Sequence, residues 1–568
     1  MTTTFVKPTI LPNIIIKDIL EYILNRIDDF EYLIDFIHRY TLISKKWNEE
    51  IIGKLKVNNR LTTTINSNYE IIKNWVRLAD RYKITFELKL KNNGLFDLYK
   101  LIGVIGDKVV TFTNLNDKLT KSDYNYYKNL KEVGFWIDRF DSGILLSEFC
   151  DNIKYKLELS YQKNYQEIPE NITEIVFNQN LFTRLKISRS VTITELGYHN
   201  QLTQLRHFNL EYIKISKNAF SSILSRSPNL EKLSIDRIIL LDCTFDIILQ
   251  CIADISIKFQ NLSIVLDKNI SISVNSVLDL LNRVQCKHVD ITFFNIKYST
   301  KEEITSAVID NTSIEKFRFT SFDARSYTNN KTMVFDLFSI WKDKSNLKDI
   351  AIGFEDYITE MVNLEKLEIR YIQGNRDELE KYINPTKLPK LKELKILVCN
   401  FPTIDQILKI NPNITKMKLY ELEINEFVSI LDSQQFPTLS DLFIEIVRQR
   451  KKKCEENVIL SAFQNNTTLR WLKIRNYDIT MENPQSFLMS IVQVNRSYIS
   501  LIVHFGPNEN YSEDKIDYNL LDEILSNNTT IKKLFLPSTI TIRKVLYNQK
   551  LIHIFNKYSV IRVTYSGM

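Results

Sequence analysis

Hydrophobic and polar positions follow two alternating periods along this chain, and residues 458–474 (VILSAFQNNTTLRWLKI) show both most clearly. Ile459, Ala462 and Phe463 have the spacing of one helix face, which predicts a short amphipathic helix. After a polar Asn-Asn-Thr-Thr turn, Leu472 and Ile474 alternate with polar or aromatic neighbours, which predicts a half-buried strand. Such a helix–turn–strand unit cannot close a core alone, so we expect it to stack on copies of itself.

The same frame recurs when Leu469 is taken as an anchor, with helix-spaced apolar residues 10, 7 and 6 positions before it and strand residues 3 and 5 after it. Other anchors that fit are Leu230, Ile314, Leu347, Ile414, Tyr498 and Ile531, while Leu391 and Leu439 follow a longer turn. The frame thus predicts helical residues before every anchor, including Ala307 and Val308 before Ile314, and Leu337, Ile340 and Trp341 before Leu347. The strand Leu364–Ile369 has no room for a helix before it.

Repeat length and the L-x-x-L-x-I strand after a helix resemble the leucine-rich repeat family. Leu391 and Ile414 are 23 residues apart, and Tyr498 and Ile531 are 33 residues apart, close to the range of that family. The resemblance implies an α/β solenoid, a horseshoe with a parallel sheet on its concave face and helices on its convex face.

The ninth position of the repeat departs from the family pattern. The family places Asn or Cys there, where the side chain bonds to neighbouring backbones. This chain instead has Ile238, Phe322, Ile372, Leu422 and Tyr477, and only Cys399 conforms. We therefore expect an uneven solenoid whose backbone groups are satisfied in another way. A generic α/β domain with strong apolar alternation is the alternative.

Composition supports a folded protein of reduced cysteines. Of 568 residues, 44% are hydrophobic and 11% aromatic, which argues against disorder. The net charge of +7 is mild for this length and does not require a nucleic-acid partner. The six cysteines are scattered without a C-x-x-C pair, which is typical of the cytosol or nucleus. No signal peptide or membrane-spanning stretch is expected, so we predict a cytoplasmic protein, with the nucleus as the alternative.

The N-terminal residues 1–55 form a separate helical module by their pattern. Pro12 is placed to begin a helix with a broad apolar face, a second apolar stretch runs from about residue 30 to 38, and a third helix near Tyr40 carries Trp47. Leu11-Pro12, Ile19-Leu20 and residues 42–47 (LISKKW) resemble the two ends of the F-box, although the connection between them is longer than in that family. An F-box before leucine-rich repeats is a familiar order of domains.

The F-box resemblance implies docking on a Skp-type adaptor of a cullin–RING ubiquitin ligase. It assigns the adaptor contact to Leu11, Pro12, Ile19 and Leu20, since an adaptor would bury an exposed apolar edge. The alternative is that these residues pack the module onto the first strands as the cap that a terminal repeat needs.

Residues 56–165 give the least regular pattern, and residues 166–568 form the solenoid and its C-terminal cap. A helix over 71–82 and strands over 84–90, 109–112, 133–137 and 155–159 are predicted in the first of these segments, which we interpret as atypical first repeats. A last helix over 545–558 and a strand over 560–563 are predicted at the C-terminal end.

Catalytic and cofactor motifs are missing from the sequence. There is no H-E-x-x-H, no phosphate-binding G-x-x-x-x-G-K-[ST] and no G-x-S-x-G, and the histidines are dispersed. We therefore expect no enzyme, no cofactor and no metal. The basic run 448–453 (RQRKKK) fits a solvated loop, with a nuclear signal or an anion-binding patch as alternatives.

A binding surface remains as the candidate functional feature. The strand positions between the apolar ones should face the open side of the sheet, and from about Lys392 onward Lys and Arg dominate them. The predicted target-binding residues are Lys416, Lys418, Arg470, Trp471, Lys473 and Arg475. An exposed Trp among Arg and Lys side chains has the composition of an interface hot spot, so we expect an acidic or phosphorylated protein segment as partner. Ordinary solubilising side chains are the alternative.

Two functional hypotheses follow. In the first, the protein is a substrate receptor of a cullin–RING ligase, in which the F-box-like module binds the adaptor and the repeats bind the target. In the second, it is a leucine-rich-repeat scaffold without a role in ubiquitin transfer.

Overall fold

The computed structural model resolves the chain into two compact units, residues 1–285 with 295–297 and residues 286–294 with 298–568. The predicted boundaries at residues 55 and 165 both lie within the first unit. The structure describes residues 13–24, 33–34, 37, 44–64, 69–91, 105–115, 125–137, 149–160, 176–189, 191–197, 200–293, 295–297, 307–321, 337–353, 356–371, 383–397, 410–422, 424–432, 436–446, 456–476, 484–495, 497–504, 517–531, 533–535, 553–554, 557–558 and 561–562.

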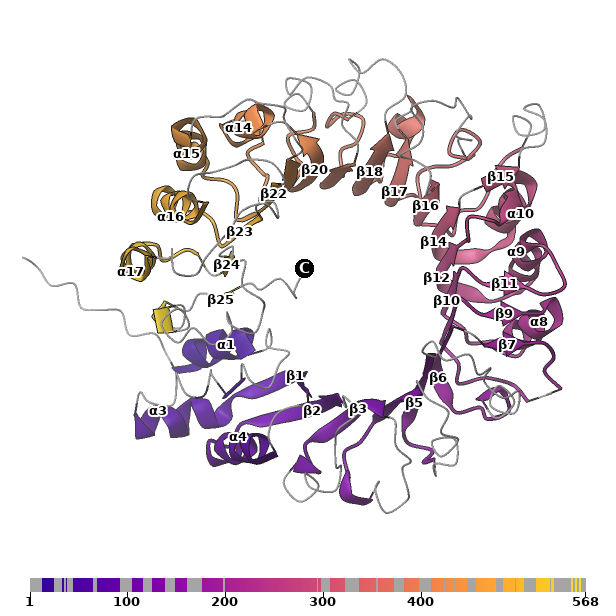
Figure 1. Cartoon of the computed structure of the whole chain (residues 1–568), viewed down its shortest axis with the longest axis horizontal. Helices are drawn as coiled ribbons and strands as arrows, with labels where there is room; N and C mark the ends of the chain where they lie inside the picture. The colour runs from indigo at the N-terminus through magenta and orange to yellow at the C-terminus, as the bar shows by residue number, and fades with distance from the viewer. Residues whose placement is uncertain are drawn as a thin grey trace, which may run out of the picture. The chain divides into compact units, whose positions relative to one another are not determined.

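The first unit is built on a parallel sheet whose strands pair in chain order (Figure 1). Its strands are β1 (Lys56–Thr64), β2 (Thr85–Lys91), β3 (Val109–Leu115), β4 (Glu132–Ile137), β5 (Lys154–Ser160), β6 (Phe182–Ser188), β8 (His207–Glu211), β10 (Lys232–Asp236) and β12 (Lys258–Val265). The strands predicted between residues 84 and 159 are thus confirmed as β2 to β5. They belong to the same sheet as the later repeats.

Helices and short strands complete the repeats of the first unit. The helices are α1 (Asn13–Leu24), α3 (Lys45–Glu50), η1 (Ile52–Lys54), α4 (Tyr69–Arg81), α8 (Lys217–Ser225), α9 (Phe245–Ala253) and α10 (Val274–Arg283). The short strands are β7 (Thr192–Ile193), β9 (Lys214–Ile215), β11 (Ile239–Leu240), β13 (Ser271–Ser273) and β15 (Asn295–Lys297). The helix predicted over 71–82 is confirmed as α4. The helix-frame residues Phe220, Ile223 and Leu224 are buried in α8.

The third predicted helix of the N-terminal module begins later than expected. Ser44 is its N-cap, and its hydroxyl accepts a hydrogen bond from the backbone N–H of Trp47, which places the start of α3 at Lys45. The apolar stretch predicted over 30–38 lies mostly outside the described residues.

The strands of the second unit also pair in parallel and in chain order. Its strands are β14 (Gln285–Phe293, of which Gln285 belongs to the first unit), β16 (Lys316–Ser321), β17 (Asp349–Gly353), β18 (Lys366–Tyr371), β19 (Glu393–Ile396), β20 (Lys416–Leu422), β21 (Asp441–Ile446), β22 (Trp471–Asn476), β23 (Ser500–His504), β24 (Lys533–Phe535) and β25 (Ile561–Arg562). The C-terminal strand predicted over 560–563 is confirmed as β25. The basic run 448–453 lies outside the described residues.

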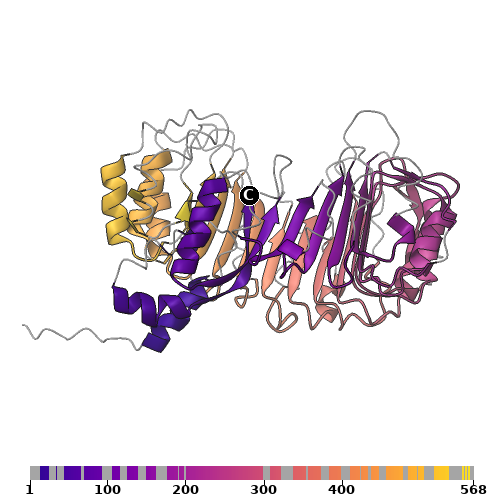
Figure 2. The same ribbon diagram turned by 90° about the horizontal axis from the view of Figure 1, so that it is seen from below.

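The helices of the second unit are η4 (Asp356–Glu360), α14 (Ile424–Asp432), α15 (Glu456–Asn465), α16 (Pro484–Val494) and α17 (Tyr518–Asn527). Figure 2 shows α14 to α17, in orange and yellow, running beside one another along the sheet. The predicted frame is confirmed here, since Ile459, Ala462 and Phe463 are buried in α15. Because consecutive strands pair in parallel and these helices line one side of them, each unit has the arrangement of a leucine-rich-repeat solenoid.

The helices predicted before Ile314 and Leu347 are wrong at their described residues. Ala307 and Val308 are not helical, and Val308 is 52% exposed. The segment 337–340 is a turn. The physical reason is a backbone bridge between Ile309 and Trp341, with the N–H of Ile309 donating to the carbonyl of Ile340 over 3.0 Å. The chain before these two anchors is therefore bound in a strand-like pair and cannot form a helix.

A ladder of buried asparagines takes the place of the missing ninth-position Asn. Asn411, Asn466, Asn495 and Asn528 each lie three residues before an anchor and are buried. Asn495 donates to the carbonyls of Phe463 and Asn466 over 2.6 and 2.8 Å, and Asn528 donates to that of Asn495 over 3.0 Å. The ladder joins each repeat to the preceding one, so the Asn-rich turns stabilise the stack.

In the first unit, backbone N–H groups at the ends of strands join neighbouring repeats. Arg189, Tyr212 and Arg237 at the ends of β6, β8 and β10 have positive φ angles of 57°, 54° and 49°. Each donates its N–H to a carbonyl of the following repeat over 2.7–2.9 Å. Ile238, the ninth-position residue, is fully buried and acts as a core residue.

None of the helices in the described part of the chain is long and apolar enough to cross a bilayer.

Candidate binding surface

The sheet face opposite the helices of the second unit carries most of the predicted target-binding residues. Along β22, Leu472 and Ile474 are buried, while Trp471, Lys473 and Arg475 point to the other face. Lys416 and Lys418 have the same orientation on β20. The period-2 pattern of these strands therefore predicted which side chains are exposed.

The parallel register brings these side chains together in two neighbouring rows. One row contains Lys416, Asp441, Trp471 and Ser500, and the other contains Lys418, Phe443, Lys473 and Ile502. They surround a hollow of about 500 Å³, which we call the basic–aromatic groove. It is lined by Lys416, Met417, Lys418, Tyr420, Asp441, Leu442, Phe443, Trp471, Leu472, Lys473, Arg475, Ser500 and Ile502.

Three aromatic side chains give the groove an apolar surface. The rings of Tyr420 and Phe443 lie 5.2 Å apart, and Trp471 is 43% exposed. Lys473 Nζ lies 5.7 Å and Arg475 Cζ lies 5.6 Å from the centre of the Phe443 ring. These are cation–π distances, so Phe443 holds two cations over its face.

The cations of the groove differ in how far they are neutralised. Lys416 lies 3.3 Å from Glu393, and Arg475 lies 3.8 Å from Glu445. Within the described residues, neither Lys418 nor Lys473 forms an ion pair. Burial, together with Arg475 and Lys418, lowers the pKa of Lys473. Neither lysine therefore has a carboxylate within ion-pair distance in this part of the chain. Burial raises the pKa of Asp441 in the same groove, and the charge of Lys418 opposes this rise.

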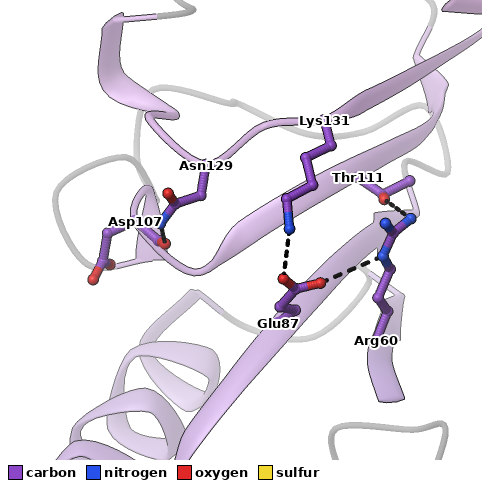
Figure 3. Close-up of polar contacts among 6 residues, drawn as sticks. All are labelled: Arg60, Glu87, Asp107, Thr111, Asn129 and Lys131. Atoms are coloured by element: carbon purple, nitrogen blue, oxygen red, sulfur yellow. Dashed lines mark hydrogen bonds and ion pairs between the residues drawn. The ribbon is translucent and has the colours of Figure 1, made fainter. Parts of the chain in front are cut away.

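Several other cations on the sheets have carboxylate partners. In the second unit Lys316 lies 2.7 Å from Asp349, and Lys366 lies 3.0 Å from Glu393. In the first unit Glu87 receives both Lys131, over 2.8 Å, and Arg60, over 3.4 Å (Figure 3). The hydrogen bond from Lys131 is the main cause of the lowered pKa of Glu87. The groove thus combines two lysines that form no ion pair with the aromatic side chains Tyr420, Phe443 and Trp471.

Figure 3 also shows how closely the first repeats are joined by polar contacts. Arg60 donates to the Thr111 hydroxyl over 3.2 Å, and Asn129 donates to the carbonyl of Asp107 over 2.6 Å. These contacts hold neighbouring strands and loops of the first repeats together.

Arg470 does not line the groove, although it was predicted with the other residues. It precedes β22, and its guanidinium donates to the carbonyl of Ser497 over 3.1 Å. Sequence reasoning also missed Tyr420, Phe443 and Asp441. A signal for them existed, because they occupy the outward positions of the strands that follow Ile414 and Leu439.

The N-terminal module gives only one described side chain among the predicted adaptor contacts. Leu20 on α1 is 4% exposed, and α1 contacts β1. Ile15 on the same helix is 43% exposed. Leu11, Pro12 and the side chain of Ile19 lie outside the described residues.

Metal-binding clusters are not found among the residues that the structure describes. Cys150, Cys243, Cys251 and Cys286 are free thiols. Burial raises the pKa of Cys243 to about 11, which disfavours the reactive thiolate at neutral pH.

Comparison with known proteins adds little to this description. No family model matches the sequence, and no curated protein matches it. Among solved structures, the chain is similar to TLR13 in the crystal structure of a TLR13–ssRNA13 complex, with 12% sequence identity over 85% of this chain and 74% of that chain and a TM-score of 0.38. A similarity at this score shows nothing about what this chain binds, whereas its paired strands and the helices beside them define the solenoid fold.

Proposed function

We propose that this protein is a non-catalytic leucine-rich-repeat scaffold that binds an acidic segment of another protein in the basic–aromatic groove. The observation that carries the proposal is the pair Lys418 and Lys473, which have no ion-pair partner among the described residues while comparable lysines on the same sheet do. Both line a hollow with the exposed Trp471 at its edge.

The charges favour an anionic partner for a simple reason. Lys418, Lys473 and Arg475 repel one another, as the lowered pKa of Lys473 reflects after the effect of burial. A carboxylate or phosphate placed beside Lys418 and Lys473 relieves this repulsion and makes charge-assisted hydrogen bonds. Exposed charges at an interface mainly raise the association rate by long-range attraction. Because salt screens this attraction, binding should weaken as the salt concentration rises.

The aromatic side chains supply the apolar part of the proposed contact. A large aromatic side chain buries about 150–250 Å² when it is fully covered, and Trp471 is still 43% exposed. Apolar side chains of the partner would pack on Trp471 and on the Phe443–Tyr420 pair. Because Trp and Arg are enriched among interface hot spots, Trp471 should contribute most of the affinity.

A fluorescence-polarisation assay tests the proposal with a labelled peptide of alternating glutamate and leucine, beside a peptide of alternating glutamine and leucine. The wild-type chain should bind the acidic peptide and not the neutral one. The Lys418→Gln/Lys473→Gln variant should bind about 10-fold more weakly, at about 0.7 kcal/mol for each exposed charge pair.

The matched control is Lys316→Gln/Lys366→Gln, which removes the same charge from lysines that are already paired with Asp349 and Glu393. This variant should keep at least half of the wild-type affinity. Equal losses in both variants would mean that net charge alone attracts the peptide, and the proposed groove would then be refuted. Equal binding of the acidic and neutral peptides would refute the acidic partner.

The finer proposal is that the chain is a substrate receptor of a cullin–RING ubiquitin ligase, as the F-box resemblance of residues 11–47 implies. The exposed Ile15 on α1 supports an apolar contact with a Skp-type adaptor. Leu20 opposes it, because its side chain is buried, and α1 contacts β1 as a capping helix would.

A pull-down of the wild-type chain from cells, probed for the adaptor and cullin, tests the ligase proposal. It should be run beside Leu11→Ala/Pro12→Ala and Ile15→Asp, with circular dichroism to establish that both variants stay folded. Adaptor bound to the wild type and lost in the folded variants would support the ligase role. Absence of the adaptor from all samples would refute that role and leave the scaffold proposal standing.

A further inference from the structure

A second row of basic side chains crosses the sheet of the first unit, far from the residues of the groove in sequence. Lys156 on β5, Arg184 on β6, His207 on β8 and Lys232 on β10 occupy the same register position on neighbouring parallel strands. All of them are at least partly exposed, so they share the solvent face of the sheet. Neighbouring strands lie about 4.8 Å apart, so Arg184 and Lys232 are about 10 Å apart at the backbone.

Carboxylates neutralise the other cations around this row. Lys156 pairs with Glu132, and Arg206 lies 3.6 Å from Glu231. Lys186 donates to Glu158 over 2.8 Å and lies 3.3 Å from Glu211, and the hydrogen bond to Glu158 is the main cause of the raised pKa of Lys186. In the part of the chain that the structure describes, Arg184 and Lys232 form no ion pair. These two unpaired cations lie on either side of His207.

The imidazole between them is held neutral. Burial, followed by the charges of Arg184 and Lys232, lowers the pKa of His207 to about 4. Lys156 acts in the same direction, and only Glu231 opposes it. A neutral imidazole still offers one ring N–H as a hydrogen-bond donor, and it gains a second donor if it takes up a proton.

We propose that Arg184, His207 and Lys232 form a carboxylate-binding site for an acidic protein segment, separate from the groove of the second unit. Both long side chains can converge on one carboxylate above the ring of His207. Their arrangement repeats that of Lys418 and Lys473, which also lie on either side of a ring in register, that of Phe443. Arg supplies the planar donor pair that fits a carboxylate.

Proton linkage follows from this geometry. A bound carboxylate offsets the charges of Arg184 and Lys232 and favours the protonated form of His207, so binding raises the pKa of the imidazole. Binding must then take up a proton in the pH range between the free pKa of about 4 and the higher bound pKa. For an anion whose own charge is constant over that range, the affinity should therefore rise as the pH falls.

Nuclear magnetic resonance of histidine labelled at Cε1 measures this directly in the full-length chain, with the signal of His207 assigned from a His207→Gln variant. The probes are hexaglutamate, hexaglutamine and sulfate, since the charge of sulfate is constant over the pH range. Hexaglutamate should raise the pKa of His207 by about one unit or more, as an opposite charge within about 4–6 Å does. Hexaglutamine should leave it unchanged.

Two variants separate this site from a general effect of charge. Arg184→Gln/Lys232→Gln should raise the pKa of free His207, because two neighbouring cations are gone, and should abolish the response to hexaglutamate. Lys186→Gln, which removes a cation that is already paired, should keep the response. A Lys418→Gln/Lys473→Gln background should also keep it, which makes the outcome independent of the groove.

The proposal is overturned if hexaglutamate leaves the pKa of His207 unchanged in the wild-type chain. It is also overturned if sulfate acts at the same concentration as hexaglutamate, since the row would then hold small anions and not a protein segment. A response that survives in Arg184→Gln/Lys232→Gln would contradict the assignment of residues.

Discussion

Asn495 is the residue whose replacement tests the stacking of the repeats most directly, because its side chain contacts three segments at once. Its amide donates to the carbonyls of Phe463 and Asn466 over 2.6 and 2.8 Å. Its oxygen accepts from the backbone N–H groups of Ser497 and Tyr498 over 2.8 and 3.1 Å. Asn495→Ala removes all of these bonds inside a buried site, since Asn495 is 2% exposed.

The magnitude follows from the groups that are left without partners. Asn466 O keeps a hydrogen bond from the Ser497 hydroxyl over 3.2 Å. Phe463 O in the last turn of α15 and the N–H groups of Ser497 and Tyr498 lose the side chain that satisfies them. At about 1 kcal/mol for each buried unsatisfied group, the local free energy of opening should fall by about 3 kcal/mol.

Hydrogen exchange followed by mass spectrometry is the suitable assay, because repeat arrays open locally and a single unfolding free energy does not describe them. A loss of 3 kcal/mol corresponds to exchange that is about 100-fold faster, in the peptides that contain residues 456–476 and 497–504. The first unit should be unchanged.

The control is Asn465→Ala, which removes a neighbouring Asn whose exposed side chain contacts only Asp432 over 2.9 Å among the described residues. Exchange in Asn495→Ala that is no faster than in Asn465→Ala would refute the ladder as a stabilising element.

Other predictions follow from single buried or perturbed groups. Tyr498→Phe should leave hydrogen exchange in peptides that contain residues 497–504 unchanged or slow it by up to about 5-fold, because the buried phenol has no hydrogen-bond partner among the described residues; faster exchange than in the wild-type chain would contradict this. Arg226→Met should speed exchange around Phe177 and Asn200 by at least about 10-fold, because the buried guanidinium donates to both carbonyls over 2.6 Å; unchanged exchange would refute that role. His207→Gln should flatten the rise of melting temperature between pH 4 and 6.5. The folded-state pKa of His207, about 4, lies below the ordinary value of 6.5, so in this range the unfolded chain binds the proton and stability is lost as the pH falls. A pH profile that the substitution leaves unaltered would exclude this contribution of His207.

Local periodicity was sufficient to predict much of the repeat. Burial of Phe220, Ile223 and Leu224 in α8 and of Leu233 and Ile235 in β10 follows the predicted offsets residue by residue. The reason is that side chains recur at about 3.6 residues in a helix and at 2 in a strand, so one apolar face can be counted directly from the sequence. Orientation of Lys418, Trp471 and Lys473 toward the open face came from the same count.

The structural role of the asparagines in the turns was not predicted from the periodicity. The Asn three residues before the anchors at Ile314, Ile414, Leu469, Tyr498 and Ile531 was present in the sequence. An Asn-rich composition hid it, because a frequent residue gives a weak signal at any one position. Only the bonds from Asn495 and Asn528 to the preceding repeats reveal its purpose.

The sequence by itself determined the two periods, the repeat and the outward side chains, because these depend on the few residues of one helix and one strand. The tertiary structure decided which repeats lack a helix, through the bridge between Ile309 and Trp341, and which lysines have a carboxylate partner. Lys366 is neutralised and Lys473 is not, because the register of parallel strands sets their neighbours. That register joins residues about 30 positions apart, and hydrogen bonds between repeats fix it.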